Sequence, residues 1–228
     1  MKTIHHREIT AQALNPYFAA DALETVIVAN LGQDAMRYQF GYDHFHYDAS
    51  AFAAGDAYID EMRRSALDAL QRGDALPARA SFGRLTHTAQ DLYAHSNYIA
   101  LWRELHPEAE PGETDPQLAV LLKDSRLHSG RLYYPLEALS FIPALKSYVI
   151  PLLPRDSHAW MNIDDPSRPN YDFAYAAAVK RTSLEYRLIA EKLTAQQSAQ
   201  FTGRLFQLET SPIFHPKTKM QNHKSEGL

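Results

Sequence analysis

Three potential metal ligands recur at intervals of four residues in one uninterrupted segment of the chain. The segment from Gly83 to Asn97 contains no proline, and its leucine and alanine residues favour a helix. His87, Asp91 and His95 would share one face of that helix. The two histidines would lie roughly 12 Å apart along the axis, whereas a histidine nitrogen lies ~2.0–2.1 Å from bound zinc. We therefore expect them to serve different ions, with Asp91 placed to bridge. A polar helix face with solvated histidines is the alternative interpretation.

Composition limits the kind of metal site that this chain can build. The 228 residues include no cysteine, which excludes disulfides, thiolate zinc sites and a cysteine nucleophile. Imidazole nitrogen and carboxylate oxygen are the remaining ligand atoms, and they suit zinc best, with manganese, iron and nickel as weaker rivals. The net charge of −4 gives no indication of general nucleic-acid binding through a basic surface.

The beginning of the chain and its apolar runs bear on localisation. Residues 1–8 show no apolar h-region, and no apolar run approaches the ~18 residues that span a membrane. These features predict no signal peptide and no transmembrane segment. We expect a cytoplasmic protein, or one exported by a leaderless route.

Hydrophobic periodicity predicts an all-α fold in a single domain. Hydrophobic residues make up 45% of the chain, enough for a sizeable core, and no strand alternation or internal repeat is visible. Prolines divide residues 123–168 into short helices and loops. We expect a catalytic, metal-binding domain over residues 1–210 and a polar, disordered tail over 211–228. The predicted helices cover residues 6–14, 21–31, 56–72, 77–102, a short segment after 116, 172–193 and 195–208.

Further histidines and aspartates outside the predicted 77–102 helix are candidate ligands. They are His6, Asp34, His44, His158 and Asp164. His46 is a rival for the position of His44, and His5 is a rival for that of His6. Asp48 is expected to cap the segment that follows it.

The short motifs of several other enzyme classes do not occur in this chain. There is no H-E-x-x-H of a zincin, no E-x-x-H of a di-iron bundle, no glycine-rich phosphate loop and no G-x-S-x-G elbow. Hydrolysis assisted by a metal ion is the chemistry for which positive evidence remains.

Four motifs occur in the same order as in a known family. They are His6-Arg7-Glu8-Ile9-Thr10-x-x-Ala13-Leu14, Ala29-Asn30-Leu31-Gly32-Gln33-Asp34, Asp43-His44-Phe45 and His87-x-x-x-Asp91-x-x-x-His95-Ser96-Asn97. Together they resemble the Het-C branch of the zinc-dependent phospholipase C and single-strand nuclease superfamily. The resemblance covers roughly residues 5–190, and the block from His87 is its most specific part.

This resemblance implies an all-helical fold with a trinuclear zinc site in a cleft. The ligands implied by position are Asp34, His44 and His87 for one ion, Asp91 and His6 for a second, and His95, His158 and Asp164 for the third.

The chain departs from the pattern of the secreted phospholipases in two ligands. Those enzymes bind one zinc through the amino group of an N-terminal tryptophan, whereas this chain begins with Met1, so we expect that ligand to be missing. His5 could replace it. The position of the final carboxylate is Asn162, so Asp164, ahead of Asp165, is expected to serve instead.

The implied function is a zinc-dependent phosphodiester hydrolase of the phospholipase C type with two or three zinc ions. Zinc would lower the pKa of a bound water towards roughly 7, and the hydroxide would attack phosphorus. Asp34 is the first candidate for the general base. The expected partner is a phospholipid or another phosphodiester. The alternatives are a single-strand nuclease, with single-stranded nucleic acid as partner, and a non-enzymatic, metal-stapled interaction protein of the Het-C type.

Overall fold

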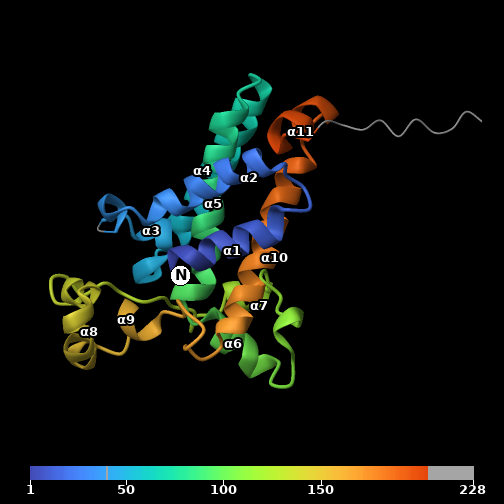
Figure 1. Ribbon diagram of the computed structural model, residues 1–228. Coiled ribbons are helices and arrows are strands. Elements are labelled where there is room, and N and C mark those ends of the chain that lie inside the picture. The colour runs from blue at the N-terminus through green and yellow to red at the C-terminus, as the bar shows by residue number, and fades with distance from the viewer. Residues whose placement is uncertain (40, 205–228) are drawn as a thin grey trace, which may run out of the picture.

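One long helix lies at the centre of the molecule and carries the candidate ligands. The computed structural model describes residues 1–39 and 41–204, so the predicted tail at 211–228 lies outside the described residues. Helix α5 (Ala75–His95) is surrounded by four other helices, as Figure 1 shows: α1 (Thr3–Leu14), α2 (Ala20–Leu31), α4 (Phe52–Gln71) and α10 (Tyr171–Ala190).

The second half of α5 is buried on all sides. From Ser81 to His95, every residue except Arg84 is buried. Gly83 permits the close approach of α2, since a Cβ atom there would lie 2.3 Å from the carbonyl oxygen of Val26. The helix can therefore hold its polar residues away from bulk water only because partners from other elements satisfy them.

The predicted 77–102 helix is interrupted. Helix α5 ends at His95, Ser96 is extended with φ −114° and ψ 169°, and α6 (Tyr98–Leu105) begins two residues later. The Ser96 hydroxyl accepts a hydrogen bond from the N–H of Tyr98 at 3.2 Å, which gives that N–H a partner outside a helical ladder. Ser96 also forms a β-bridge with Ser129.

The remaining elements are short, and within residues 123–168 they follow the prolines, as predicted. The α-helices are α3 (Asp43–His46), α7 (Ala119–Leu122), α8 (Pro143–Val149), α9 (His158–Met161) and α11 (Ala195–Thr202), and the 3-10 turns are η1 (Gly32–Asp34), η2 (Met36–Tyr38), η3 (Asp48–Ser50), η4 (Pro111–Glu113), η5 (Glu137–Phe141) and η6 (Ile150–Leu152). Helix α11 ends earlier than predicted because Gly203, at φ +70°, turns the chain.

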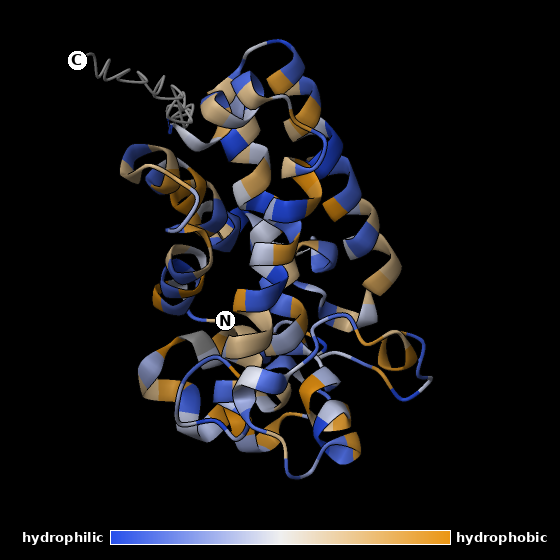
Figure 2. Ribbon diagram, turned by 90° about the vertical axis from the view of Figure 1, so that its right-hand side faces the viewer, coloured by the Kyte–Doolittle hydropathy of each residue, from blue (hydrophilic) through white to orange (hydrophobic). Residues whose placement is uncertain are grey.

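The prediction of an all-α fold is confirmed. Apart from two isolated β-bridges, residues 1–39 and 41–204 contain helices, turns and loops and no strand. Hydrophilic and hydrophobic residues are mixed along the helices in Figure 2, and none of the described helices is both long and apolar enough to cross a membrane.

Candidate metal centre

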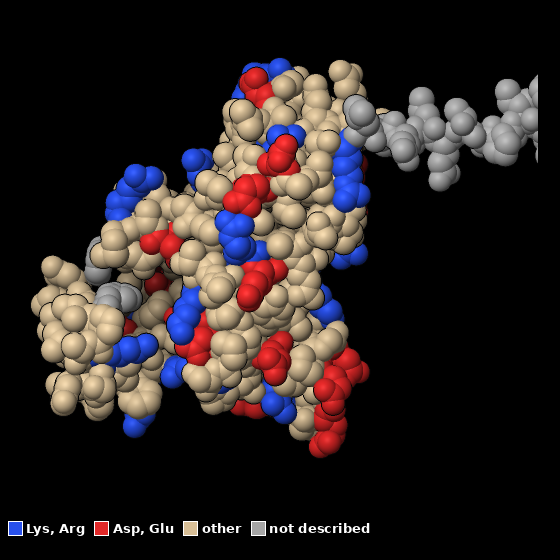
Figure 3. All heavy atoms as spheres, in the orientation of Figure 1, with Lys and Arg blue, Asp and Glu red and all other residues tan. Residues whose placement is uncertain are grey.

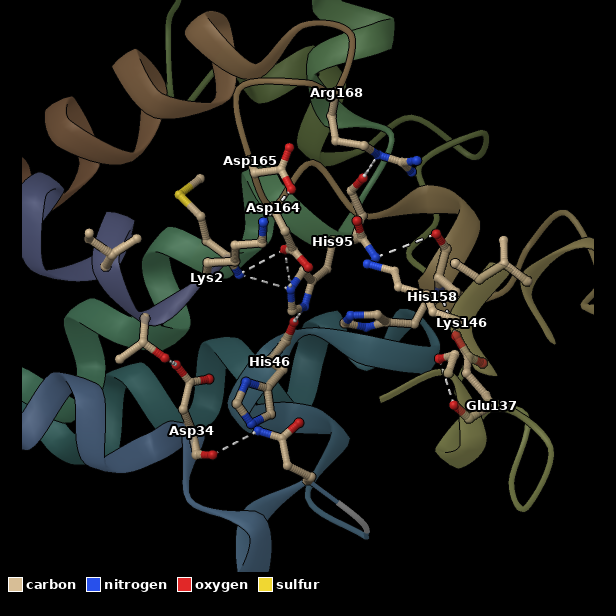
Figure 4. Close-up of a pocket in the computed structure, with 18 of the residues that line it drawn as sticks. Lys2, Asp34, His46, His95, Glu137, Lys146, His158, Asp164, Asp165 and Arg168 are labelled. Carbon is tan, nitrogen blue, oxygen red and sulfur yellow. Dashed lines mark hydrogen bonds and ion pairs between the residues drawn. The ribbon is translucent and has the colours of Figure 1, made fainter. Parts of the chain in front are cut away.

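Five elements and one loop bring histidine and aspartate side chains to one face of α5. His87, Asp91 and His95 are 0–5% exposed on this helix. Figure 4 shows several of the side chains converging on the space beside His95. The side chains from other elements are His6 of α1, Asp34 of η1, His46 of α3, Asp48 of η3, His158 of α9 and Asp164 of the following loop.

The first group of ligand atoms has the dimensions of a tetrahedral metal site. His46 Nδ1, His87 Nε2 and Asp91 Oδ2 lie 3.0, 3.1 and 3.2 Å from one another. Atoms bound ~2.0–2.1 Å from a tetrahedral ion would be about 3.3 Å apart. The His46 Nε2 and His87 Nδ1 atoms are buried without a hydrogen-bond partner. These three residues can therefore hold an ion with little rearrangement.

His6 belongs to a second group, with Asp34 and His87. The His6 ring stacks on the His87 ring with centroids 4.2 Å apart. Its Nδ1 atom lies 2.6 Å from Gln90 Oε1. The Gln90 amide nitrogen donates to the hydroxyls of Thr10 and Thr182, which fixes the amide orientation, so Gln90 Oε1 must accept from His6 Nδ1.

This hydrogen bond determines which nitrogen of His6 faces the site. With the proton of the neutral ring on Nδ1, the Nε2 atom carries a lone pair. Nε2 is buried without a hydrogen-bond partner and lies 3.2 Å from Asp91 Oδ1. A lone pair against a carboxylate is repulsive unless a cation or a proton lies between them. Metal-binding histidines are commonly oriented by a hydrogen bond from the ring nitrogen that does not bind the metal. Gln90 orients His6 in the same way.

The third group lies at the C-terminal end of α5. Asp48 Oδ1 lies 3.1 Å from His158 Nδ1 and 3.4 Å from His95 Nδ1. The His95 and His158 rings are 4.4 Å apart between centroids. His95 Nε2 points the other way and lies 3.5 Å from Asp164 Oδ1. His95 therefore contacts carboxylates through both ring nitrogens.

The amino nitrogen of Met1 lies in the site, contrary to the expectation that an amino group is missing there. It is 2.8 Å from Asp91 Oδ1, 3.1 Å from Asp164 Oδ1 and 3.0 Å from His95 Nε2. Helix α1 places it there because residues 3–14 pack between α2 and α10. His5, predicted as its substitute, instead pairs with Glu8 at 2.9 Å.

Burial and charge displace several pKa values among the protein groups. Burial and the neighbouring His6 lower the pKa of His87 to about 4. Burial raises the pKa of Asp91, but the Met1 ammonium and the surrounding histidines outweigh it and hold that pKa well below its usual range. Burial and the ammonium lower the pKa of His95, whereas Asp91, Asp48 and Asp164 raise it to about 10, so the carboxylates dominate there.

The structure brings together every predicted ligand except His44. His44 contacts the rings of Phe45 and Tyr58 instead, with centroids 4.4 and 5.7 Å away. Residues 43–46 form one helical turn, in which side chains two apart point in different directions, and His46 is the one that faces α5. The structure therefore places the rival His46, and not His44, among the candidate ligands.

Asp48 was expected to cap the next segment, but its carboxylate faces the candidate ligands. It is 3% exposed, between Tyr47 and Ala49, which both have positive φ values. This left-handed backbone turns Asp48 towards His95 and His158. Neither neighbouring residue is a glycine, so no residue pattern indicates such a turn.

A cavity of about 740 Å³ opens onto the ligands. It is lined by His46, His95, His158, Asp34 and Asp164, which we call its inner side, and by Lys146 and Ile150 among others, which we call its outer side. Figure 4 shows Lys146 and Glu137 across this space from Asp34. A molecule in the cavity could therefore reach ions bound to the inner groups.

Fold and site together define an all-helical domain with a buried histidine and aspartate centre. The chain belongs to the VWA7 N-terminal domain family, whose family model matches residues 4–125. It is 32% identical over 87 residues to von Willebrand factor A domain-containing protein 7 of Rattus norvegicus. That match covers 38% of this chain and 10% of the rat protein, so the chain spans a small part of that relative. No solved structure matches the chain.

This family membership corrects the resemblance drawn from the motifs. The assignment to the Het-C branch of the phospholipase C superfamily was wrong, and with it the phospholipase C function and its nuclease and Het-C alternatives. The motifs were short, and histidines and aspartates four residues apart occur on any helix with a polar face. The matched region contains His6, Asp34 and the three ligands of α5 but not His158 or Asp164.

Proposed function

We propose that this domain binds two or three divalent transition-metal ions, zinc foremost, on the inner face of the cavity. The observation that carries the proposal is the orientation of His6. Gln90 fixes its Nδ1 as the donor and leaves the lone pair of Nε2 directed at Asp91, 3.2 Å away and without a hydrogen-bond partner. A metal ion between the two atoms turns this repulsion into coordination.

The charge of the site supports the same proposal. Asp34, Asp48, Asp91 and Asp164 bring four carboxylates into or beside a buried space. Buried carboxylates need compensating positive charge. Each divalent ion supplies two positive charges, and the ligand set of imidazole and carboxylate without thiolate suits zinc.

The test is elemental analysis of full-length protein purified without chelator. We expect two or three equivalents of zinc per chain. His106→Ala and His128→Ala are matched controls, because neither residue belongs to a ligand group, and both variants should keep the full metal content. Less than one equivalent of any transition metal in the wild-type protein would overturn the proposal.

A second proposal is that the centre hydrolyses a substrate in the cavity, which the opening of that cavity onto the candidate ligands supports. Metal ions, when bound, supply Lewis acidity and lower the pKa of water. Asp34 is the residue for proton transfer. It lies in the cavity wall, and its carboxylate accepts a hydrogen bond from the Thr3 hydroxyl at 3.2 Å and lies 3.7 Å from His87 Nε2.

An activated acyl ester such as p-nitrophenyl acetate tests this chemistry, because it reports a nucleophilic water without demanding specific recognition. The metal-loaded protein should accelerate its hydrolysis, chelator should abolish the effect, and added zinc should restore it. Asp34→Asn should lower turnover at least about tenfold more than it lowers metal content. A metal-loaded protein without any such activity would leave the domain a metal-binding module and not an enzyme.

A further inference from the structure

The outer side of the cavity is formed by two segments with unusually exposed apolar side chains. We call residues 36–39, 41–42 and 134–152 the rim. Met36 and Gln39 line the cavity from the first segment, and Ser140, Lys146 and Ile150 line it from the second. The large hydrophobic residues of the second segment that are 37–75% exposed are Tyr134, Leu136, Leu139, Ile142, Leu145, Tyr148 and Leu152.

The rim cannot bury these side chains within its own fold. The second segment packs on a small core of Val149, Leu153 and Ala159, separate from the main core of the domain. Helix α8 lies in this segment and stands apart from the central helices in Figure 1. Monomeric soluble proteins rarely expose apolar patches of this kind unless the patches are used for interaction.

The exposed charges of the rim have one sign. Among its described residues, the exposed charged side chains are Arg37 and Lys146. Its one carboxylate, that of Glu137, is 1% exposed and accepts backbone N–H groups from Tyr133 and Ala159. In Figure 3 the surface at the lower left, where α8 lies, is mostly tan with blue at its margins. The rim is therefore apolar and basic in a chain whose net charge is −4.

We propose that the rim docks on the surface of an anionic lipid bilayer. Protruding leucine, isoleucine and tyrosine side chains with basic neighbours are the combination that inserts into the boundary between headgroups and acyl chains. A bilayer accepts projecting side chains without a complementary shape, and its negative surface attracts Arg37 and Lys146. The rim borders the cavity, so docking would bring the opening of the cavity to the membrane surface.

Vesicle co-sedimentation of the full chain tests this proposal. We expect binding to phosphatidylcholine vesicles that contain phosphatidylserine, and weaker binding without phosphatidylserine or at high salt. The variant Ile142→Ser/Tyr148→Ser/Leu152→Ser should bind more than about tenfold more weakly. Lys146→Ala should weaken binding about fivefold.

The matched control is Val28→Ser/Leu76→Ser, which removes two apolar side chains of 59% and 63% exposure outside the rim. It should bind vesicles like the wild-type protein. Absence of vesicle binding, or equal binding by the rim and control variants, would overturn the proposal. So would a chain that self-associates in lipid-free buffer and becomes monomeric in the rim variant, because the rim would then be an interface between copies.

Discussion

The buried half of α5 and the rim invert the usual distribution of residues in opposite ways. In α5, His87, Asp91 and His95 are polar side chains inside the molecule, whereas Ile142 and Tyr148 in the rim are apolar side chains outside it. Burying polar groups and exposing apolar ones each oppose folding stability. Under the two proposals above, metal ions compensate the first arrangement and a bilayer surface the second.

The largest effect on metal content and stability is expected at Asp91, which contacts the most candidate ligands. Asp91 is fully buried and contacts His6, His46 and His87 at 3.0–3.2 Å. Asp91→Asn removes a negative charge shared by all three ring contacts. It should lose more than one metal equivalent and lower the free energy of unfolding by roughly 3–5 kcal/mol, as the breaking of a buried ion pair does. Elemental analysis and urea unfolding measure the two effects.

Asp124→Asn is the control for the charge alone. Asp124 pairs with the exposed Arg126 at 2.8 Å. It belongs to none of the candidate ligand groups. Its replacement should leave the urea unfolding midpoint and the metal content unchanged, because exposed ion pairs contribute little to stability. An Asp91→Asn protein that kept its full metal content would show that Asp91 serves packing and hydrogen bonding alone.

The two ends of the buried half of α5 should lose different ions. His87 belongs to the groups near His6 and His46, and His95 belongs to the group with Asp48 and His158, on one unbroken helix. His87→Ala and His95→Ala should each remove at least about one metal equivalent. The double variant should lose the sum, because separated sites usually add. Loss of the same single ion by both variants would contradict separate sites.

Substitution of the two histidines of α3 in turn should show which of them is a metal ligand. His46 Nδ1 lies 3.0 Å from Asp91, whereas His44 packs against Phe45 and Tyr58. His46→Ala should therefore lose about one equivalent of metal, and His44→Ala should lose none while keeping the same net charge. Equal losses in elemental analysis would mean that the loop rearranges on metal binding and that His44 also serves as a ligand.

The sequence was informative where the determinants are local. The spacing of ligands on α5, the all-α fold and the division of residues 123–168 by prolines depend on periodicity and backbone chemistry within short segments. His46 and Asp48 depend on the path of α3 and η3, and the break after His95 depends on Ser129, 33 positions after Ser96. Such contacts between distant segments leave no pattern in a single sequence.

The exposure of the apolar residues of the rim could not be predicted from the sequence for a similar reason. Ile142 and Val149 lie seven positions apart in a mostly apolar stretch that Lys146 and Ser147 interrupt, and hydrophobicity alone would place both in a core. The structure separates them, with Ile142 47% and Val149 6% exposed. Only the position of α8 away from the central helices shows which of the two has a partner within the chain.

Substitutions of exposed rim residues should have the smallest effect on the free energy of unfolding. This small effect would distinguish the rim from the buried half of α5. Ile142→Ala shortens an exposed side chain that no apolar core covers and adds no N-cap to α8, so the free energy of unfolding should change by no more than about 0.5 kcal/mol in urea unfolding without lipid. Val149→Ala, in the small core beneath, is the matched variant and should lower it by about 1–2 kcal/mol through the lost contacts. A cost for Ile142→Ala as large as that for Val149→Ala would show that the rim is packed within the chain. The proposal that the rim is an apolar surface available to a membrane would then be wrong, whereas the proposal of metal ions in the polar interior would be unaffected.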